Sequence, residues 1–497
     1  MKARRRIALI VSCAFAGGVM LVHPLIVHDG FFDINRAKAY SFIFAAYIAF
    51  ILRIIFEKRR ALRGRPGLFF GAAFAAVLTL SVIFARDTAA ALFDFDGRQC
   101  GAVYFGALLC AAYVCAGESK SRLWSVHAFL CAGAPVCALA ALNFFHIDPF
   151  GFYTKLSARY AKGFISTIGN TDFFAAFLSL YLPLACVTAC ETRGLKRIFA
   201  LVCAGMGAAG VIWCRADGAF IALGASAYLL LRRGAFDALA CVTGALSAAG
   251  ALCHAFKTHI MSLSGCLCRY IAEYPAVCAA LAAACALICI VQKRRSDRPY
   301  VRSYRQTADI SAGLFVACVC AAFVYFTFID RMSVLDKALS HLRFSDTWGT
   351  YRGAVWTRAL RLYLHSDVKT LLLGYGPGGL SAPLWEQYGA ELASIAGRRF
   401  NDAHSSVIQY LLTTGALGLS ALCGLISCAL ARAFKNGGAP GNAALCAAVT
   451  YILHSLLTVT QPETGPLFVV LLFSAYARGS ADAPDKKRCG GVTDARA

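Results

Sequence analysis

Charged residues are scarce in this sequence. The chain has 497 residues, of which 15% are charged and 59% are hydrophobic, and its mean hydropathy is +0.62. Soluble globular domains are about a quarter charged and about half apolar. The scarcity of charge therefore excludes a chain of ordinary soluble domains and indicates a membrane protein.

Acidic residues are the scarcer of the two charged kinds, because 26 Asp and Glu stand against 49 Lys and Arg, for a formal net charge of +23. In a soluble protein this excess would suggest nucleic acid as a partner. In a membrane protein, basic residues collect in the loops on one side of the bilayer. We therefore expect the lipid bilayer as a partner, and no nucleic acid.

Ionisable side chains are nearly absent from the apolar runs, where His127 and His454 are the clear exceptions. Ion-coupled transporters usually keep carboxylates or paired charges at membrane depth, where these groups bind the coupling ion. Their scarcity argues against ion-coupled transport, and we interpret both histidines as packed, hydrogen-bonded side chains. We expect the polar residues that carry the chemistry to lie at the outer face of the membrane instead.

Metal-ligand spacings are missing as well. The chain has 23 cysteines, but most lie inside apolar runs, where a free thiol behaves as a small hydrophobic side chain. The nearest paired spacing, Cys266-Leu-Cys268, is too short and too isolated for a metal site. We expect no metal, no cofactor and no disulfide framework.

Long apolar runs, by contrast, are abundant. A spanning helix needs about 20 mostly apolar residues, and runs of this length cross a membrane as helices. The sequence predicts an all-α, polytopic integral membrane protein with twelve to fourteen transmembrane helices. The fourteen candidate runs lie near residues 7–28, 38–56, 67–85, 100–116, 123–146, 172–190, 196–213, 217–231, 236–254, 272–291, 308–329, 405–431, 442–460 and 464–478.

Orientation follows from the basic residues of the loops. Lys2 and Arg4 to Arg6 precede a long first run without a clear cleavage site, which is typical of a retained signal anchor. With a cytoplasmic N-terminus, lysine and arginine are far more frequent on the inner side, once the long loop 330–403 is set aside. We predict that both termini are cytoplasmic and that loop 330–403 lies at the outer face.

These features divide the chain into five parts. N-terminal transmembrane helices occupy 1–164, and central transmembrane helices occupy 165–329. An outer loop with amphipathic helices follows at 330–403, because a loop of this length usually carries function or its own structure. C-terminal transmembrane helices occupy 404–478, and a cytoplasmic tail at 479–497 is expected to be disordered.

Three residues in the outer segments are candidates for chemistry. Arg215 lies in a tight turn, and Arg352 lies on a predicted amphipathic helix, Tyr351 to Leu364, with Arg358 and Arg361. Each arginine is either a surface side chain or an anion clamp, since guanidinium matches phosphate with paired donors. His404 is either a polar tip at the membrane surface or a general base near neutral pH, with Asp402 placed to orient its ring.

Four segments carry a family resemblance. They are Gly169-Asn170-Thr171-Asp172-Phe173, the turn Arg215-Ala-Asp-Gly-Ala, Arg352 to Trp356 with the loop Gly374-Tyr375-Gly376-Pro377-Gly378, and His404-Ser405-Ser406-Val407-Ile408-Gln409 with Gly415 and Gly418. Together and in this order they resemble the O-antigen ligase family of bacterial membrane glycosyltransferases, which includes protein O-oligosaccharyltransferases and is related to O-antigen polymerases. Cys214 stands where the family usually has serine.

The resemblance implies a GT-C-like fold in the bacterial inner membrane and a role in lipopolysaccharide or surface polysaccharide synthesis. Such enzymes pass a glycan from an undecaprenyl diphosphate carrier to an acceptor hydroxyl at the periplasmic face, with inversion and without a metal. Arg215 and Arg352 would then bind the diphosphate, and His404 would deprotonate the acceptor. Supporting positions would be Asp402, Arg358, Asn170 and Lys162.

Two alternatives stay open at this point. The chain is either a ligase, acting on a glycolipid, glycan or protein acceptor, or a polymerase that joins carrier-linked repeat units. A third hypothesis is a lipid-glycan exporter without chemistry, in which the arginines only guide the anionic head group.

Overall fold

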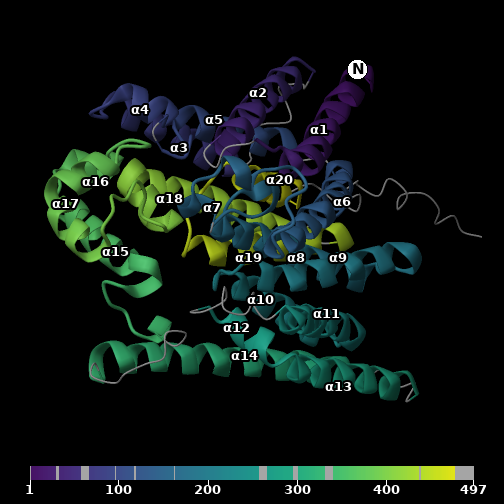
Figure 1. The fold of residues 1–497 in the computed structure, drawn as a ribbon. Coiled ribbons are helices and arrows are strands. Elements are labelled where there is room, and N and C mark those ends of the chain that lie inside the picture. The colour runs from purple at the N-terminus through teal and green to yellow at the C-terminus, as the bar shows by residue number, and fades with distance from the viewer. Residues whose placement is uncertain are drawn as a thin grey trace, which may run out of the picture.

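The computed structural model describes residues 2–28, 33–56, 66–95, 97–116, 119–161, 163–256, 266–294, 300–330, 340–435 and 438–475. Within these ranges every regular element is a helix and no strand occurs (Figure 1). Nine helices of the described ranges are long and apolar enough to cross a membrane. The prediction of an all-α, polytopic membrane protein is confirmed.

Each predicted apolar run contains a helix. These helices are α1 (Lys2–Val22), α2 (Asp33–Phe56), α3 (Pro66–Ile83), α5 (Ala102–Cys115), α6 (Ser119–Phe144), α8 (Thr171–Glu191), α9 (Gly194–Trp213), α10 (Ala219–Arg232), α11 (Phe236–Ala255), α13 (Pro275–Arg294), α14 (Tyr300–Val324), α18 (Ser406–Lys435), α19 (Ala439–Ser455) and α20 (Gly465–Ala475). Further helices lie between them, namely α4 (Thr88–Phe93), α7 (Ala158–Ala161), α12 (Cys268–Glu273), α15 (Trp348–Leu364), α16 (Val368–Leu373) and α17 (Ser381–Ala396).

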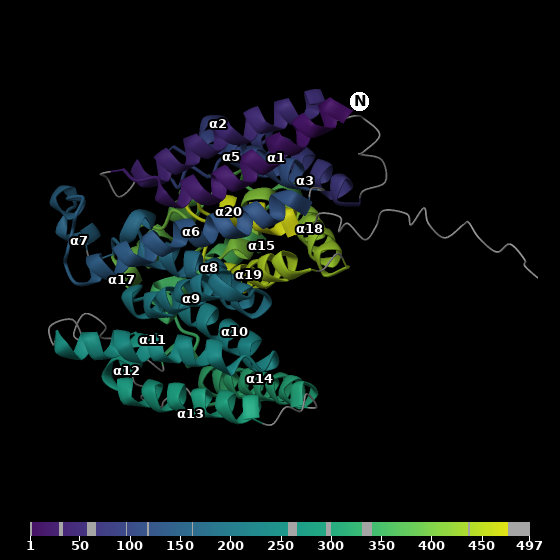
Figure 2. The same cartoon turned by 90° about the vertical axis from the view of Figure 1, so that its right-hand side faces the viewer.

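Helix α8 forms the centre of the bundle. It packs against α9, α10 and α19, and 94% of its apolar window is buried. Helix α14 is the opposite case, because its window is more hydrophobic and 0% buried. A helix that is apolar on all sides and exposed must be solvated by lipid. Figures 1 and 2 show α13 and α14 as an outer layer on one side of the bundle, with α1 and α2 on the other side.

The segment 330–403 contains a small folded unit made of α15, α16 and α17, beside α18 (Figure 1). The predicted amphipathic helix is present as α15, and its buried face includes Val355, Ala359 and Leu362. These side chains form a separate apolar cluster with residues of α17 and the start of α18. The loop therefore rests on the same helix that follows His404.

The glycine loop after α16 packs into a break in α18. Gly374 and Gly415 both have positive φ, and a Cβ atom on Gly415 would overlap the backbone of Leu372. The amide of Tyr375 donates to the Leu412 carbonyl at 2.8 Å. Only glycine allows two backbones to approach in this way at positive φ. The predicted continuous span 405–431 is thus wrong in one respect, because α18 is broken at Gly415.

Candidate functional site

A cavity of about 350 Å³ lies where the outer segments meet the start of α8. Four residues singled out from the sequence line it: Asn170, Arg352, Asp402 and His404. They come from three stretches that are far apart along the chain. We refer to this space as the arginine cavity; its lining is Asn35, Gly97, Arg98, Tyr160, Asn170, Asp172, Phe173, Gly349, Thr350, Arg352, Arg398, Arg399, Phe400, Asn401, Asp402 and His404.

The loop that carries His404 is held by hydrogen bonds between two side chains and the backbone of Ala403. The indole Nε1 of Trp356 donates to the Ala403 carbonyl at 2.7 Å, and the Ala403 amide donates to Gln409 Oε1 at 2.8 Å. His404 itself has a φ of 50°, a left-handed conformation that L-residues rarely adopt without such support. The tryptophan and glutamine of the two sequence motifs therefore fix the backbone at the histidine.

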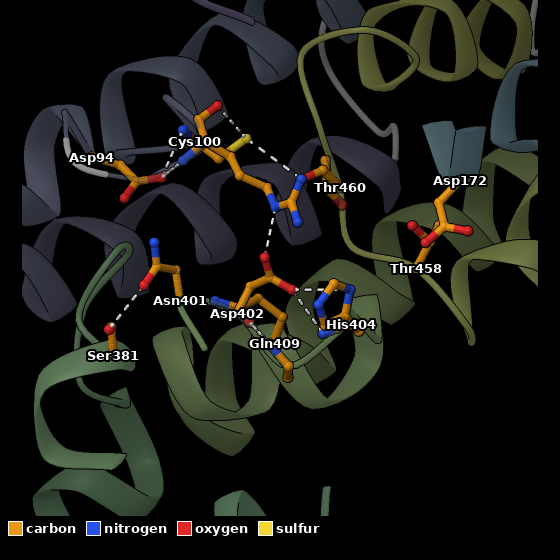
Figure 3. A network of polar contacts seen from close by, with 12 residues as sticks. Asp94, Cys100, Asp172, Ser381, Asn401, Asp402, His404, Gln409, Thr458 and Thr460 are labelled. Carbon is orange, nitrogen blue, oxygen red and sulfur yellow. Dashed lines mark hydrogen bonds and ion pairs between the residues drawn. The ribbon is translucent and has the colours of Figure 1, made fainter. Parts of the chain in front are cut away.

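Asp402 contacts both the histidine and an arginine. Its Oδ1 accepts from the His404 amide at 2.9 Å and lies 3.5 Å from the ring Nδ1, as Figure 3 shows. Its Oδ2 accepts from Arg98 Nε at 2.6 Å. With Nδ1–H directed at the carboxylate, Nε2 is left as the acceptor of a proton. The expected role of Asp402 in orienting the ring therefore has a geometric basis.

The electrostatics of the pair favour a charged Asp402 and a neutral His404. Burial raises the pKa of Asp402, but Arg98 and His404, through their charges and hydrogen bonds, together lower that pKa below its usual range. Burial lowers the pKa of His404; Asp402 raises it, whereas Arg98 and Arg352 lower it further. An imidazole with a lowered pKa stays neutral near pH 7, as a general base must.

Arg352 follows a strained turn at the start of α15. Gly349, Thr350 and Tyr351 all have positive φ, which is unusual for consecutive residues and costs energy at the two that are not glycine. Arg352 Nη2 donates to Asp172 Oδ2 at 3.1 Å, and Nη1 donates to the Gly349 carbonyl at 3.2 Å. Its Nε has no hydrogen-bond partner within the described part of the chain. The guanidinium is therefore held in place, and its Nε–H donor still lacks a hydrogen-bond acceptor within the described residues.

Asn170 lines the cavity and caps a helix. Its side-chain oxygen accepts from the amides of Asp172 at 2.8 Å and Phe173 at 3.3 Å, which caps the N-terminus of α8. The cap fixes the first turn of α8, and this turn presents Asp172 to Arg352. The asparagine of the motif therefore acts on the site through the carboxylate of Asp172.

Three arginines of the cavity were not predicted from the sequence. Arg98 lies in the turn between α4 and α5, where Asp94 Oδ2 accepts from its amide at 2.9 Å. Its guanidinium also stacks 4.8 Å from the centre of the Phe173 ring. Arg398 and Arg399 directly precede the His404 stretch. Arg98 matches no motif, but the adjacent pair was visible as a charge doublet.

Two of the predicted residues, Arg358 and Arg215, are described by the structure and are not in the cavity lining. Arg358 is 6% exposed and forms ion pairs with Asp346 and with Glu391, the latter at 2.6 Å. Its charge is therefore balanced by carboxylates of the 330–403 unit. Arg215 lies in the α9–α10 turn with a φ of 54°. Cys214 Sγ lies 3.7 Å from the Thr171 carbonyl oxygen, so this turn packs against the residue that follows Asn170. Lys162 lies outside the described residues.

The cavity combines a cationic lining with a histidine. Four arginines stand against two aspartates, so the site favours an anionic ligand, and guanidinium groups match phosphate with paired donors. His404 lines the same cavity. The arrangement suits a reaction in which a phosphate-bearing group leaves while a hydroxyl loses its proton.

Comparison with known proteins agrees with this geometry. Residues 260–423 match the family model described as O-antigen ligase. The matched segment includes Arg352, the glycine loop and His404, whereas Arg98 and Asp172 lie before it. No curated protein matches the sequence.

Proposed function

We propose that this chain is a glycosyltransferase of the outer face of the bacterial inner membrane, because residues 260–423 match the family model described as O-antigen ligase. Its donor is a glycan linked to an undecaprenyl diphosphate-type carrier, and its acceptor is a hydroxyl group of a glycolipid, glycan or protein. Both chain termini are then cytoplasmic, as the distribution of lysine and arginine predicts.

One observation carries the proposal. His404, with Asp402 behind its ring, shares a single cavity with Arg352 and three further arginines. An exporter needs cations to guide an anionic head group, but it has no use for an oriented imidazole in a strained loop. A neutral base beside a cationic cluster is what displacement of a diphosphate by a hydroxyl requires.

The proposed reaction is one direct displacement. The acceptor oxygen attacks the anomeric carbon and its proton passes to His404 Nε2, while the bond from that carbon to the diphosphate oxygen breaks. The leaving diphosphate gains one negative charge, which Arg352 and Arg98 stabilise, and His404 becomes an imidazolium stabilised by Asp402. A single attack from the opposite face inverts the anomeric configuration, and no metal takes part.

The test is a transfer assay with the purified wild type in right-side-out vesicles, with a carrier-linked glycan and a membrane-impermeant acceptor outside. We expect one released undecaprenyl diphosphate for each glycosylated acceptor, with inverted configuration. Chain extension with carrier-linked glycan alone identifies a polymerase. Movement of intact donor across the bilayer without any transfer contradicts the proposal and favours an exporter.

The acid limb of the pH profile gives a second test. Because the pKa of His404 lies below the ordinary 6.5, the acid midpoint of kcat/KM for wild type is expected below that pH. Arg98→Met removes a cation that lowers this pKa, so the midpoint should rise, whereas Asp402→Asn removes the anion that raises it, so the midpoint should fall. Each shift is expected to be about one pH unit.

These two substitutions serve as controls for each other, since they break the same ion pair from opposite sides. Loss of the pair alone would move both profiles in the same direction. Shifts of equal sign would therefore contradict the assignment of the acid limb to His404.

A further inference from the structure

The turn between α9 and α10 is held by the short segment that leads into α12. Cys266 Sγ donates to the Arg215 carbonyl at 3.2 Å, and the Leu267 amide donates to Asp217 Oδ1 at 2.7 Å. Arg215 has a φ of 54°, a left-handed conformation that persists only where the surroundings support it. A thiol therefore supplies one of the hydrogen bonds that fix the backbone at Arg215.

The same turn is connected to the arginine cavity. Cys214 precedes Arg215, and its Sγ lies 3.7 Å from the Thr171 carbonyl oxygen. The residue after Thr171 is Asp172, which forms the ion pair with Arg352. A shift of the turn would therefore act on the first turn of α8 and on the carboxylate that holds Arg352.

A second thiol lies against the first. The side chain of Cys268 hydrogen-bonds to that of Cys266, so the two side chains face each other. Leu267 between them has a φ of −60° and a ψ of −29°, a helical conformation that places the flanking Cα atoms about 5.5 Å apart. Disulfides join Cα atoms that are about 4.4 to 6.8 Å apart. The geometry therefore allows a disulfide between Cys266 and Cys268.

The spacing of the two cysteines does not create this contact by itself. Cys318 and Cys320 of α14 have the same spacing, but they lie inside a continuous helix. Side chains two positions apart on a helix do not face each other. Cys266, by contrast, precedes α12, and Cys268 is its first residue. The bend before α12 therefore brings the two thiols together.

The two thiols differ in accessibility and acidity. Cys266 is partly exposed, whereas Cys268 is buried. The hydrogen bond from Cys268 lowers the pKa of Cys266, although burial and the charge of Asp217 oppose this shift. The hydrogen bond to Cys266 and burial raise the pKa of Cys268. Because the thiolate is the nucleophile in thiol chemistry, Cys266 is the residue expected to react first.

We propose that Cys266 and Cys268 form a reversible disulfide at the outer face of the membrane, and that this disulfide weakens the support of the Arg215 turn and lowers glycan transfer. The inference rests on the proposed function, which places the segment outside the cytoplasm, where disulfides persist. A disulfide that closes so short a loop adds little stability, because the entropic gain grows with loop length. The pair therefore serves regulation and not stability.

The oxidant is the disulfide of a small thiol or of a thiol–disulfide oxidoreductase. The Cys266 thiolate attacks one sulfur of that disulfide, whose sulfur–sulfur bond breaks and releases a first thiol. Cys268 then loses its proton and attacks Cys266 Sγ, which releases the second thiol. The oxidant gains two electrons and two protons from the pair. Cys266 thereby loses the S–H group that donates to the Arg215 carbonyl.

The test exposes the wild-type protein in right-side-out vesicles to oxidised glutathione, a disulfide that does not cross the bilayer. After denaturation and alkylation of the remaining thiols, trypsin releases peptide 258–269, which contains Cys266 and Cys268 and no other cysteine. We expect this peptide without alkyl groups and two hydrogen masses lighter than the dithiol. Peptide 306–331 contains Cys318 and Cys320; it is the matched control and should carry two alkyl groups.

Glycan transfer should respond to the same treatment. We expect oxidation to lower kcat/KM for the donor about fivefold, the size of one lost hydrogen bond, and dithiothreitol to restore it. Cys266→Ser keeps a hydroxyl that can donate to the Arg215 carbonyl, so this variant should stay active in both buffers. Cys318→Ser is its control and should lose activity on oxidation as the wild type does.

Alkylation of both cysteines in detergent, where glutathione reaches the whole protein surface, would overturn the disulfide. A link between Cys266 and Cys214, or a lasting glutathione adduct on Cys266, would overturn the pairing. Equal kcat/KM before and after oxidation would overturn the effect on the Arg215 turn while the proposed function stands. A disulfide that forms in inverted but not in right-side-out vesicles would overturn the outer-face placement and, with it, the proposed function. Absence of transfer in both buffers overturns the proposed function alone, because the peptide masses still decide about the disulfide.

Discussion

Replacement of His404 by alanine is expected to lower kcat for glycan transfer by about a thousandfold, the range that a positioned general base contributes. The KM of the donor should change little, because the arginines that bind the diphosphate stay in place. Steady-state kinetics with the purified variant measure both values. Added imidazole should restore part of the rate, since the arginine cavity has room for a small base once the side chain is removed.

His365→Ala is the matched control for this variant. His365 is an exposed histidine at the end of α15, and its Nδ1 lies 2.8 Å from the Arg361 carbonyl, so its loss should leave the kinetics unchanged. Near-normal kcat in the folded His404→Ala protein would remove the base from the mechanism. A fall in thermal stability without imidazole rescue would instead assign His404 a purely structural role.

Replacement of Arg352 by lysine is expected to lower kcat/KM for the donor by about a hundredfold, similar to the loss of one donor to a developing negative charge. Lysine keeps the charge but loses the planar group that donates to Asp172 and Gly349 at the same time. Donor titrations should show both a higher KM and a lower kcat, because the guanidinium holds the diphosphate before and during bond cleavage.

Arg361→Lys makes the same chemical change on the same helix. Arg361 is exposed and lies outside the cavity lining, so this variant should behave as wild type. Equal kinetics for Arg352→Lys and Arg361→Lys would show that Arg352 is a structural residue that does not contact the donor.

The helical part of the fold was predictable because a bilayer imposes a strict rule. Backbone groups in lipid must be paired within the segment, so apolar runs of sufficient length become helices whatever their neighbours. Each predicted run contains a helix in the structure. The break of α18 at Gly415 was not predictable, because it depends on the glycine loop of α16 that packs against it.

The candidate site was predictable only in part. His404, Arg352 and Asn170 belong to motifs with recognisable spacing, and the structure places them in one cavity. Arg358 has the same residue type and lies on the same helix as Arg352, yet it is buried between two carboxylates. Helical spacing shows which face a residue occupies, but it does not show which partners that face meets.

The sequence by itself determined the membrane class and the helical runs, and it singled out His404 and Arg352, which share the arginine cavity, because these depend on local composition and short motifs. Only the tertiary structure decided that Arg98 completes the Asp402–His404 group and that Arg215 lies outside the cavity lining. The physical reason is separation along the chain. Contacts between side chains some 300 residues apart depend on how the helices pack, and no local pattern of residues encodes that packing.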